Sequence, residues 1–320
     1  MSLQNVVRIF ASVTLIALLC PAMAQAQIYR WVDDKGQVHF SDKPVDKAKA
    51  EVVNIETSSS SWQPLDIEVI RQGNFAADAA QLDTARVQRD VNNVYRFYDQ
   101  VMYFDFYRKV PVKIHLLADQ DQYMRFVRDV MKTDGSMSKG VFIPALNEIA
   151  VFIHPPELGG IESTYATIRH EASHAILFSL ASLMPVWLNE GMAEQMETLT
   201  DDGGQLQIAM HAENKAVCQH YQTQLPDALE YTRIRGDIWQ QTNRQTGMNQ
   251  AMAGQMVYQL LAKNYGRSLI TRLLQDYHRG VNRRVYYLLD EHYIGGKEAF
   301  RIHWQQWLNS GMNQPAAIRF

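Results

Sequence analysis

The stretch Arg169-His170-Glu171-Ala172-Ser173-His174 lies in a run from Ser163 to Leu180 that contains no proline or glycine, and such a run favours a helix. Side chains four residues apart lie one above the other on a helix, so His170 and His174 can direct ring nitrogens at one metal ion. Glu171 is then expected beside the open coordination position, where it can take a proton from water that the metal has acidified. The stretch therefore predicts a zinc site on a helix.

A second segment supplies a candidate for the third ligand. After Met184-Pro185 the chain reads Val186-Trp187-Leu188-Asn189-Glu190-Gly191-Met192-Ala193-Glu194-Gln195, which predicts a helix with a proline at its start. If this helix returns beside the first, Glu190 completes two imidazoles and one carboxylate with an open site for water, as in catalytic zinc sites. The alternative interpretation is an ordinary helix with two unrelated histidines, followed by the exposed carboxylate pair Glu190 and Glu194.

The pair of motifs, His170-Glu171-x-x-His174 and Trp187-Leu188-Asn189-Glu190-Gly191-x-Ala193-Glu194, resembles the gluzincins, the zinc peptidases related to thermolysin. Residues from about 85 to 310 are similar to the compact bacterial branch of that clan. The resemblance implies an α+β, zincin-like domain with a mixed β-sheet lobe, an active-site helix and a helical C-terminal lobe. It also implies that His170, His174 and Glu190 bind Zn²⁺, that Glu171 is the general base, and that Glu194 hydrogen-bonds a ligand histidine and fixes its ring.

The sequence departs from the family in the residue that stabilises the oxyanion, usually a Tyr or His from the helical lobe. The stretch Met256-Val257-Tyr258-Gln259-Leu260-Leu261 resembles the family's closing helix, so Tyr258 is assigned this catalytic role, with Tyr231 and His211 as the other candidates. His174 and Glu190 are also closer in sequence than in thermolysin, which fits the compact branch.

Substrate binding is predicted from the same resemblance. No Gly-x-Met-Glu-Asn segment precedes His170, which favours an endopeptidase or a specialised hydrolase over an aminopeptidase. The strand that ends near Ile153 is expected to be the edge to which an extended peptide adds, and His154 at its end could line the cleft.

Residues 1–26 have the order of parts of a signal peptide: Arg8, an apolar run from Ile9 to Leu19, and small residues that allow cleavage after Ala24 or Ala26. The apolar run is shorter than the roughly 20 residues of a membrane span, so a retained anchor is the alternative. Lipid attachment at Cys20 is disfavoured, because no small residue precedes it. The pattern predicts a periplasmic or secreted protein.

The first segment of the mature chain predicts a β-hairpin module at residues 27–57. Residues 28–32 and 37–41 are expected to be strands around the turn 33–36. The segment resembles a small module of unknown function near the N-termini of many Gram-negative envelope proteins. A polar linker at residues 58–61 leads to the zincin-like domain, residues 65–320.

Within that domain, hydrophobic periodicity predicts an amphipathic helix from Leu82 to Val101 and a second helix at residues 119–131. Strands are expected at residues 110–117, and at 141–143 and 149–153 as a pair around Asn147. The chain beyond Gly160 is expected to be mostly helical.

The net charge of −3 gives no reason to expect nucleic acid as a partner, and no segment after the leader is apolar enough to span a membrane. The favoured function is a zinc metallopeptidase acting on peptide or protein substrates in the cell envelope. The alternatives are a catalytically inactive envelope binding or scaffolding protein with a zincin fold, and an amidase acting on cell-wall peptides. The oligomeric state is not predicted.

Overall fold

The computed structural model describes residues 28–32, 38–41, 51–53, 62–75, 82–104, 111–133 and 138–320. The chain divides into two compact units, residues 1–61 and 62–320. The predicted signal peptide, the turn 33–36 and the linker 58–61 lie outside the described residues. Within the described ranges, no helix combines the length and the apolar character needed to cross a membrane.

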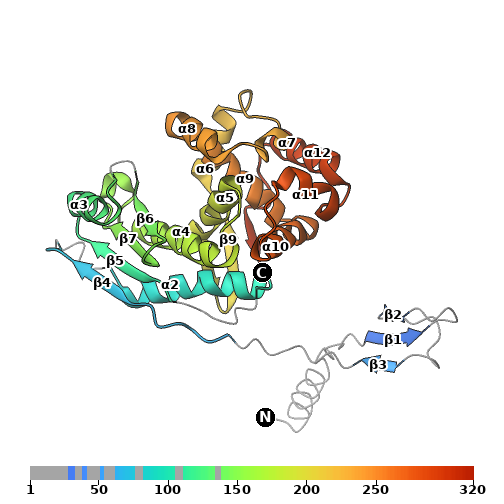
Figure 1. Ribbon diagram of the computed structural model, residues 1–320, viewed down its shortest axis with the longest axis horizontal. Helices are drawn as coiled ribbons and strands as arrows, with labels where there is room; N and C mark the ends of the chain where they lie inside the picture. The colour runs from blue at the N-terminus through green and yellow to red at the C-terminus, as the bar shows by residue number, and fades with distance from the viewer. Residues whose placement is uncertain are drawn as a thin grey trace, which may run out of the picture. The chain divides into compact units, whose positions relative to one another are not determined.

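The first unit contains a three-stranded antiparallel sheet (Figure 1). The predicted hairpin forms β1 (Ile28–Val32) and β2 (Val38–Ser41), which pair antiparallel with Val32 opposite Val38. A third strand, β3 (Glu51–Val53), pairs with the other edge of β1 and was not predicted.

The second unit is built on a mixed sheet of four strands in the order β4-β5-β7-β6. These are β4 (Val69–Gln72), β5 (Lys113–Leu117), β6 (Gly140–Ile143) and β7 (Glu148–Phe152). β4, β5 and β7 run parallel, whereas β6 returns antiparallel to β7 through the turn at Asn147. The sheet, with the helices around it, confirms the α+β class. It also corrects the predicted substrate edge: the strand that ends near Ile153 is the inner strand β7, and β6 is at the edge.

Helices cover both faces of this sheet (Figure 1). Alternate residues of β7 point to opposite faces: Ile149 and Val151 pack in the main core with α4 (Gly160–Ala181), while Ala150 and Phe152 pack with α3 (Gln120–Met131). Coverage of both faces explains why this strand is almost continuously apolar. α2 (Thr84–Arg96) and the π-helical turn that follows it (Phe97–Val101) pack against α4. A 3₁₀ turn (Pro156–Leu158) precedes α4.

The chain after α4 is mostly helical, as predicted. Its helices are α5 (Val186–Glu197), α6 (Ala212–His220), α7 (Ala228–Tyr231), α8 (Gly236–Thr246), α9 (Met248–Leu261), α10 (Asn264–His278), α11 (Val285–His292) and α12 (Gly296–Asn309). A small antiparallel sheet was not predicted: β8 (Leu199–Asp202), β9 (Gln205–Ala209) and the C-terminal β10 (Ala317–Arg319). β10 pairs with β9 from more than a hundred residues away, a long-range pairing that local periodicity does not reveal.

α5 packs between α4 and the buried helix α9, which fixes its position relative to the sheet. The contact with α9 is close at Gly191. A Cβ atom at this position would lie 2.6 Å from the carbonyl oxygen of Ala253 and 2.6 Å from Val257 Cγ2. The absence of a side chain at Gly191 therefore allows the two helices to approach.

We predict that Gly191→Ala lowers the free energy of unfolding by about 2 kcal/mol, because overpacking a close contact costs roughly 1–3 kcal/mol. Urea denaturation followed by circular dichroism measures the loss. Gly236→Ala is the matched control, since its new methyl group meets only the end of the Val186 side chain, at 3.0 Å. Equal losses in the two variants would contradict the packing at Gly191.

Candidate metal centre

α4 and α5 bring three potential ligands together. His170 and His174 lie one turn apart on α4 with ring centroids 4.8 Å apart, and Glu190 comes from α5. Glu190 Oε2 lies 3.6 Å from His170 Nε2 and 3.7 Å from His174 Nε2. A tetrahedral zinc ion with bonds of about 2.0–2.2 Å holds its ligand atoms about 3.4 Å apart. The three side chains thus converge at a spacing that suits one small divalent cation.

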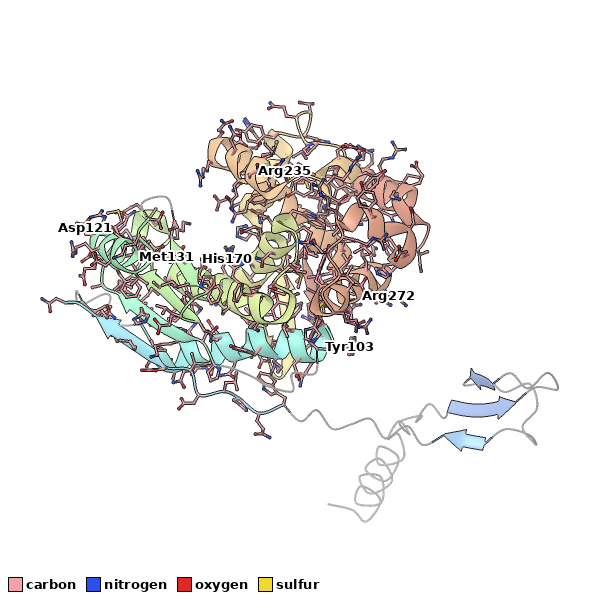
Figure 2. The ribbon with its side chains drawn as sticks, viewed as in Figure 1. Tyr103, Asp121, Met131, His170, Arg235 and Arg272 are labelled. Atoms are coloured by element: carbon pink, nitrogen blue, oxygen red, sulfur yellow. The ribbon has the colours of Figure 1, made fainter. Side chains whose placement is uncertain are left out.

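The position of this group is visible in Figure 2, where His170 is labelled on α4, in the middle of the second unit. The sheet and α3, labelled at Asp121 and Met131, lie on one side of it. The helices that follow α5 lie on the other side, with Arg235 labelled at the start of α8. The three ligands therefore lie between the sheet and the C-terminal helices.

Hydrogen bonds fix the orientation of both imidazole rings. His170 Nδ1–H donates to Glu197 Oε1 at 2.8 Å, and His174 Nδ1–H donates to Asn189 Oδ1 at 3.1 Å. Each bond places a proton on Nδ1, so that Nε2, which faces Glu190, is the nitrogen that can bind a metal ion. Metal-binding histidines are typically held in this way, by an oxygen acceptor on the nitrogen that does not bind the metal.

The carboxylate that orients His170 is Glu197, which corrects the prediction of Glu194. Glu194 Oε1 is 3.9 Å from His170 Nδ1. Its two oxygens accept other hydrogen bonds, from Gln250 Nε2 at 2.6 Å and from Asn214 Nδ2 at 2.7 Å. Glu194 and Glu197 lie on the same face of α5 as Glu190. The side-chain amides of α6 and α9 nevertheless hold Glu194 away from the His170 ring.

Glu197 also connects the centre to His211, one of the three residues considered for the oxyanion. His211 Nε2–H donates to Glu197 Oε2 at 3.1 Å. Burial by itself would raise the pKa of the Glu197 carboxyl, but its hydrogen bonds with His170 and His211 outweigh burial and hold the pKa well below its ordinary value. His170, Glu194 and Glu197 form a second group with ligand-like spacing, which shares His170 with the first. The hydrogen bonds of Glu197 make it a supporting carboxylate.

Glu171 is buried beside the ligands, where the edge strand meets α4. Burial raises the pKa of its carboxyl, against the opposing charges of His174 and His170. Gly140 of β6 makes the close approach possible, because a Cβ there would lie 2.6 Å from Thr167 Cγ2 and 3.2 Å from Glu171 Cγ. The carboxylate predicted as the general base thus lies next to the open edge of the sheet.

The tyrosines considered for the oxyanion are both in the hydrophobic core. Tyr258 is 1% exposed, its hydroxyl donates to the carbonyl of Pro315 at 2.9 Å, and its ring packs against Trp307. Tyr231 is also buried, and its hydroxyl donates to the carbonyl of Asn249. Both hydroxyls are thus engaged in the core, which argues against the catalytic role predicted for Tyr258.

His154 does not line the ligand site. It is 2% exposed, its backbone N–H donates to Thr164 Oγ1 at 2.9 Å, and its ring hydrogen-bonds the Lys139 carbonyl at 3.2 Å. These bonds tie the end of β7 to α4 and to the residue before β6. The role of His154 is therefore to connect backbone segments.

Sequence reasoning missed three residues that support the centre: Asn189, Glu197 and Arg169. Asn189 and Glu197 had a detectable signal, since they flank the ligand on the predicted helix and Glu197 follows Glu190 by seven residues, which returns to the same helix face. Arg169 had none. The Arg169 Nε–H donates to the Met196 carbonyl at 2.9 Å. The residue before His170 therefore contacts the end of α5.

Comparison with known proteins adds information about the N-terminal module. The family model "Domain of unknown function (DUF4124)" matches residues 15–64, which include the predicted module at 27–57. The chain is thus similar there to a family of unknown function, as predicted. No curated protein matches the chain. The family match ends well before the candidate ligands.

We predict that Glu197→Gln weakens zinc binding by about tenfold, the lower end of the 10–100-fold range for residues that orient metal ligands. An amide offers one accepting oxygen, so either His170 or His211 loses its acceptor. Competition with a chromophoric chelator measures the affinity. Glu213→Gln, which changes an exposed carboxylate of α6, is the control, and an equal change in both variants would rule out a specific role for Glu197.

Proposed function

We propose that residues 62–320 form a zinc-dependent peptidase domain of the gluzincin type, and that the chain acts in the bacterial cell envelope. One observation carries the proposal: two imidazole Nε2 atoms and one carboxylate oxygen converge, while an oxygen acceptor holds the Nδ1–H of each imidazole. A set of two histidines and one glutamate leaves a coordination position open, which is typical of catalytic zinc sites. Glu171 lies beside the set and is not part of it.

In the proposed mechanism, His170, His174 and Glu190 would hold the zinc ion. When bound, zinc supplies Lewis acidity, which polarises a carbonyl group and lowers the pKa of water to about 7. Glu171 takes the proton of the attacking water at its carboxylate and later gives it to the leaving amine. Glu197 and Asn189 keep both rings in the Nδ1–H form throughout.

The substrate is bound along the sheet edge. β6 is the edge strand next to Glu171, and an extended peptide can pair with an edge strand as an additional strand. Main-chain pairing of this kind presents a peptide bond to the ligand triad without requiring a particular side chain. It therefore supports a peptide or protein substrate.

Two features support the envelope as the location. Residues 1–26 have the order of parts of a signal peptide, with a basic residue, an apolar run and small residues at the cleavage site. The family that matches residues 15–64 occurs in bacterial envelope proteins. A periplasmic or secreted peptidase is consistent with both.

A binding protein that keeps the metal without turnover is the second candidate. The burial of Tyr258 and Tyr231 favours it, because neither hydroxyl is free to stabilise an oxyanion. Hydrolysis of peptides by the zinc-loaded chain distinguishes the two functions.

We predict that Glu171→Gln retains one equivalent of zinc and lowers kcat for peptide hydrolysis by at least about 10²-fold, the usual contribution of a general base. Gln cannot accept the proton, but it leaves the three ligands in place. Quenched fluorescent peptides measure the rate, and metal analysis of the same sample measures the zinc. A variant with full zinc and wild-type rates would exclude Glu171 as the base.

A second prediction concerns Tyr258. Tyr258→Phe removes only the hydrogen bond to the Pro315 carbonyl, so we expect about 1 kcal/mol lower stability and unchanged kcat. Thermal unfolding and the same peptide assay measure the two effects. A large fall in kcat with unchanged stability would restore the tyrosine to the catalytic machinery.

A further inference from the structure

A crevice opens at the carboxyl ends of β5 and β7, which are neighbouring parallel strands of the four-stranded sheet. β5 leads into α3 on one face of the sheet, whereas β7 leads into α4 on the other face. Because the two connections leave the sheet on opposite faces, they part from each other and leave a space between them. Ligands of sheets covered by helices commonly bind at such a place, outside the carboxyl ends of the strands.

Hydrogen bonds at the strand ends show where the two connections part. The pairing of β5 with β7 continues as far as a bond from the Ile153 N–H to the Leu117 carbonyl, at 2.9 Å. The next residue after β5, Ala118, donates instead to the Gln72 carbonyl of β4, at 3.2 Å. On the other side, the His154 N–H donates to a side chain of α4. The crevice therefore begins directly beyond the paired strands.

The crevice is a cavity of about 540 Å³, within the range of about 300–1,000 Å³ in which proteins bind small molecules. Ala118 and the beginning of α3 form one side of it, and Ile153, Pro155, Pro156 and Ile161 form much of the other. Proline has no N–H group, so the two prolines add rigid surface without a hydrogen-bond donor. Most of the surface of the wall is apolar.

Two polar side chains of the wall already have partners within the protein. The Asp119 carboxylate accepts from the Gln122 N–H at 2.8 Å and from Gln122 Nε2 at 2.6 Å. The His154 ring forms hydrogen bonds with Ser163 Oγ at 3.0 Å and with the Lys139 carbonyl at 3.2 Å. Burial lowers the pKa of the His154 imidazole, so this side chain is uncharged near neutral pH. Neither group therefore requires a polar ligand.

The charges around the crevice favour neither an anion nor a cation. Among the described residues of its wall, the charged side chains are Asp119 and Asp121, and both are acidic. An anion would find no basic side chain to pair with in the wall, and burying an unpaired charge is costly. α3 and α4 both begin at the crevice, and the partial positive charge at their N-termini offsets the attraction of the two carboxylates for a cation.

We propose that this crevice is a second binding site, which takes a small uncharged apolar molecule between the connections that follow β5 and β7. The site is separate from the candidate metal centre, because His170 comes ten residues after Gly160 on α4, which corresponds to about 15 Å along the helix. A molecule bound here contacts the beginning of the helix that carries both ligand histidines. The site does not depend on the proposed peptidase function, since the described residues that line it include neither the metal ligands nor Glu171.

The test measures binding of N-phenyl-1-naphthylamine, an uncharged apolar dye, to the full chain by its fluorescence. We expect saturable binding of about one dye per chain, as one cavity of this size provides. Ala118→Phe places a ring in the crevice and should raise the Kd of the dye at least about tenfold. The dye 8-anilinonaphthalene-1-sulfonate has the same rings and an added sulfonate. It should bind to the wild type at least about tenfold more weakly, because its charge would be buried without a partner.

Two further variants control for the place of binding and for folding. Phe178 is 49% exposed and does not line the crevice, so it is a competing apolar surface, and Phe178→Ala should leave the Kd of the uncharged dye unchanged. Asp121, labelled in Figure 2 at the beginning of α3, is exposed, so Asp121→Lys is informative even if Ala118→Phe does not fold. This change should lower the Kd of the sulfonate dye about threefold, the effect of a weak surface ion pair, and leave the uncharged dye unaffected.

The assignment of the crevice is overturned if the uncharged dye does not saturate or if both dyes bind equally. It is also overturned if Phe178→Ala weakens binding of the uncharged dye and Ala118→Phe does not, or if Asp121→Lys leaves the sulfonate dye unaffected. His174→Ala, which removes a predicted metal ligand, should bind the uncharged dye as the wild type does. Failure of the chain to bind zinc or to hydrolyse peptides would therefore overturn the proposed function and leave the dye result in place.

Discussion

The distance between α4 and α5 governs the candidate metal centre, because its ligand atoms come from both helices. Arg169 constrains this distance: it donates hydrogen bonds to the carbonyls of Met196 and Glu197 at the end of α5, and to Asp90 of α2 at 2.7 Å. Hydrogen bonds from a charged guanidinium are roughly twice as strong as neutral ones. Since Arg169 precedes His170, the turn of α4 that carries the first ligand also holds the end of the second helix.

The carboxylates on one face of α5 differ in role because their neighbours differ. Glu190 faces the two Nε2 atoms, two amides hold Glu194, and Glu197 accepts from two histidines. Two helices therefore provide the ligands and the carboxylate that orients a ligand.

The ligand cluster could be predicted from the sequence because helix geometry places His170 and His174 together once the helix is given. The sequence could not distinguish Glu194 from Glu197, since both share the face of Glu190 and the choice depends on amides contributed by other helices. Tyr258 could not be oriented from the sequence because α9 is buried on nearly all sides, so its apolar residues do not mark one face. Strand order is also non-local, which is why the inner strand β7 was mistaken for the edge.

The metal content of the purified full chain tests most directly whether two helices build one cation site. Wild type and His174→Ala are equilibrated with buffered zinc, desalted and measured by plasma mass spectrometry. We predict about one zinc per wild-type chain and less than about one tenth in the variant, because loss of one of three protein ligands removes most of the affinity. Equal zinc in both proteins, or none in the wild type, would contradict the site.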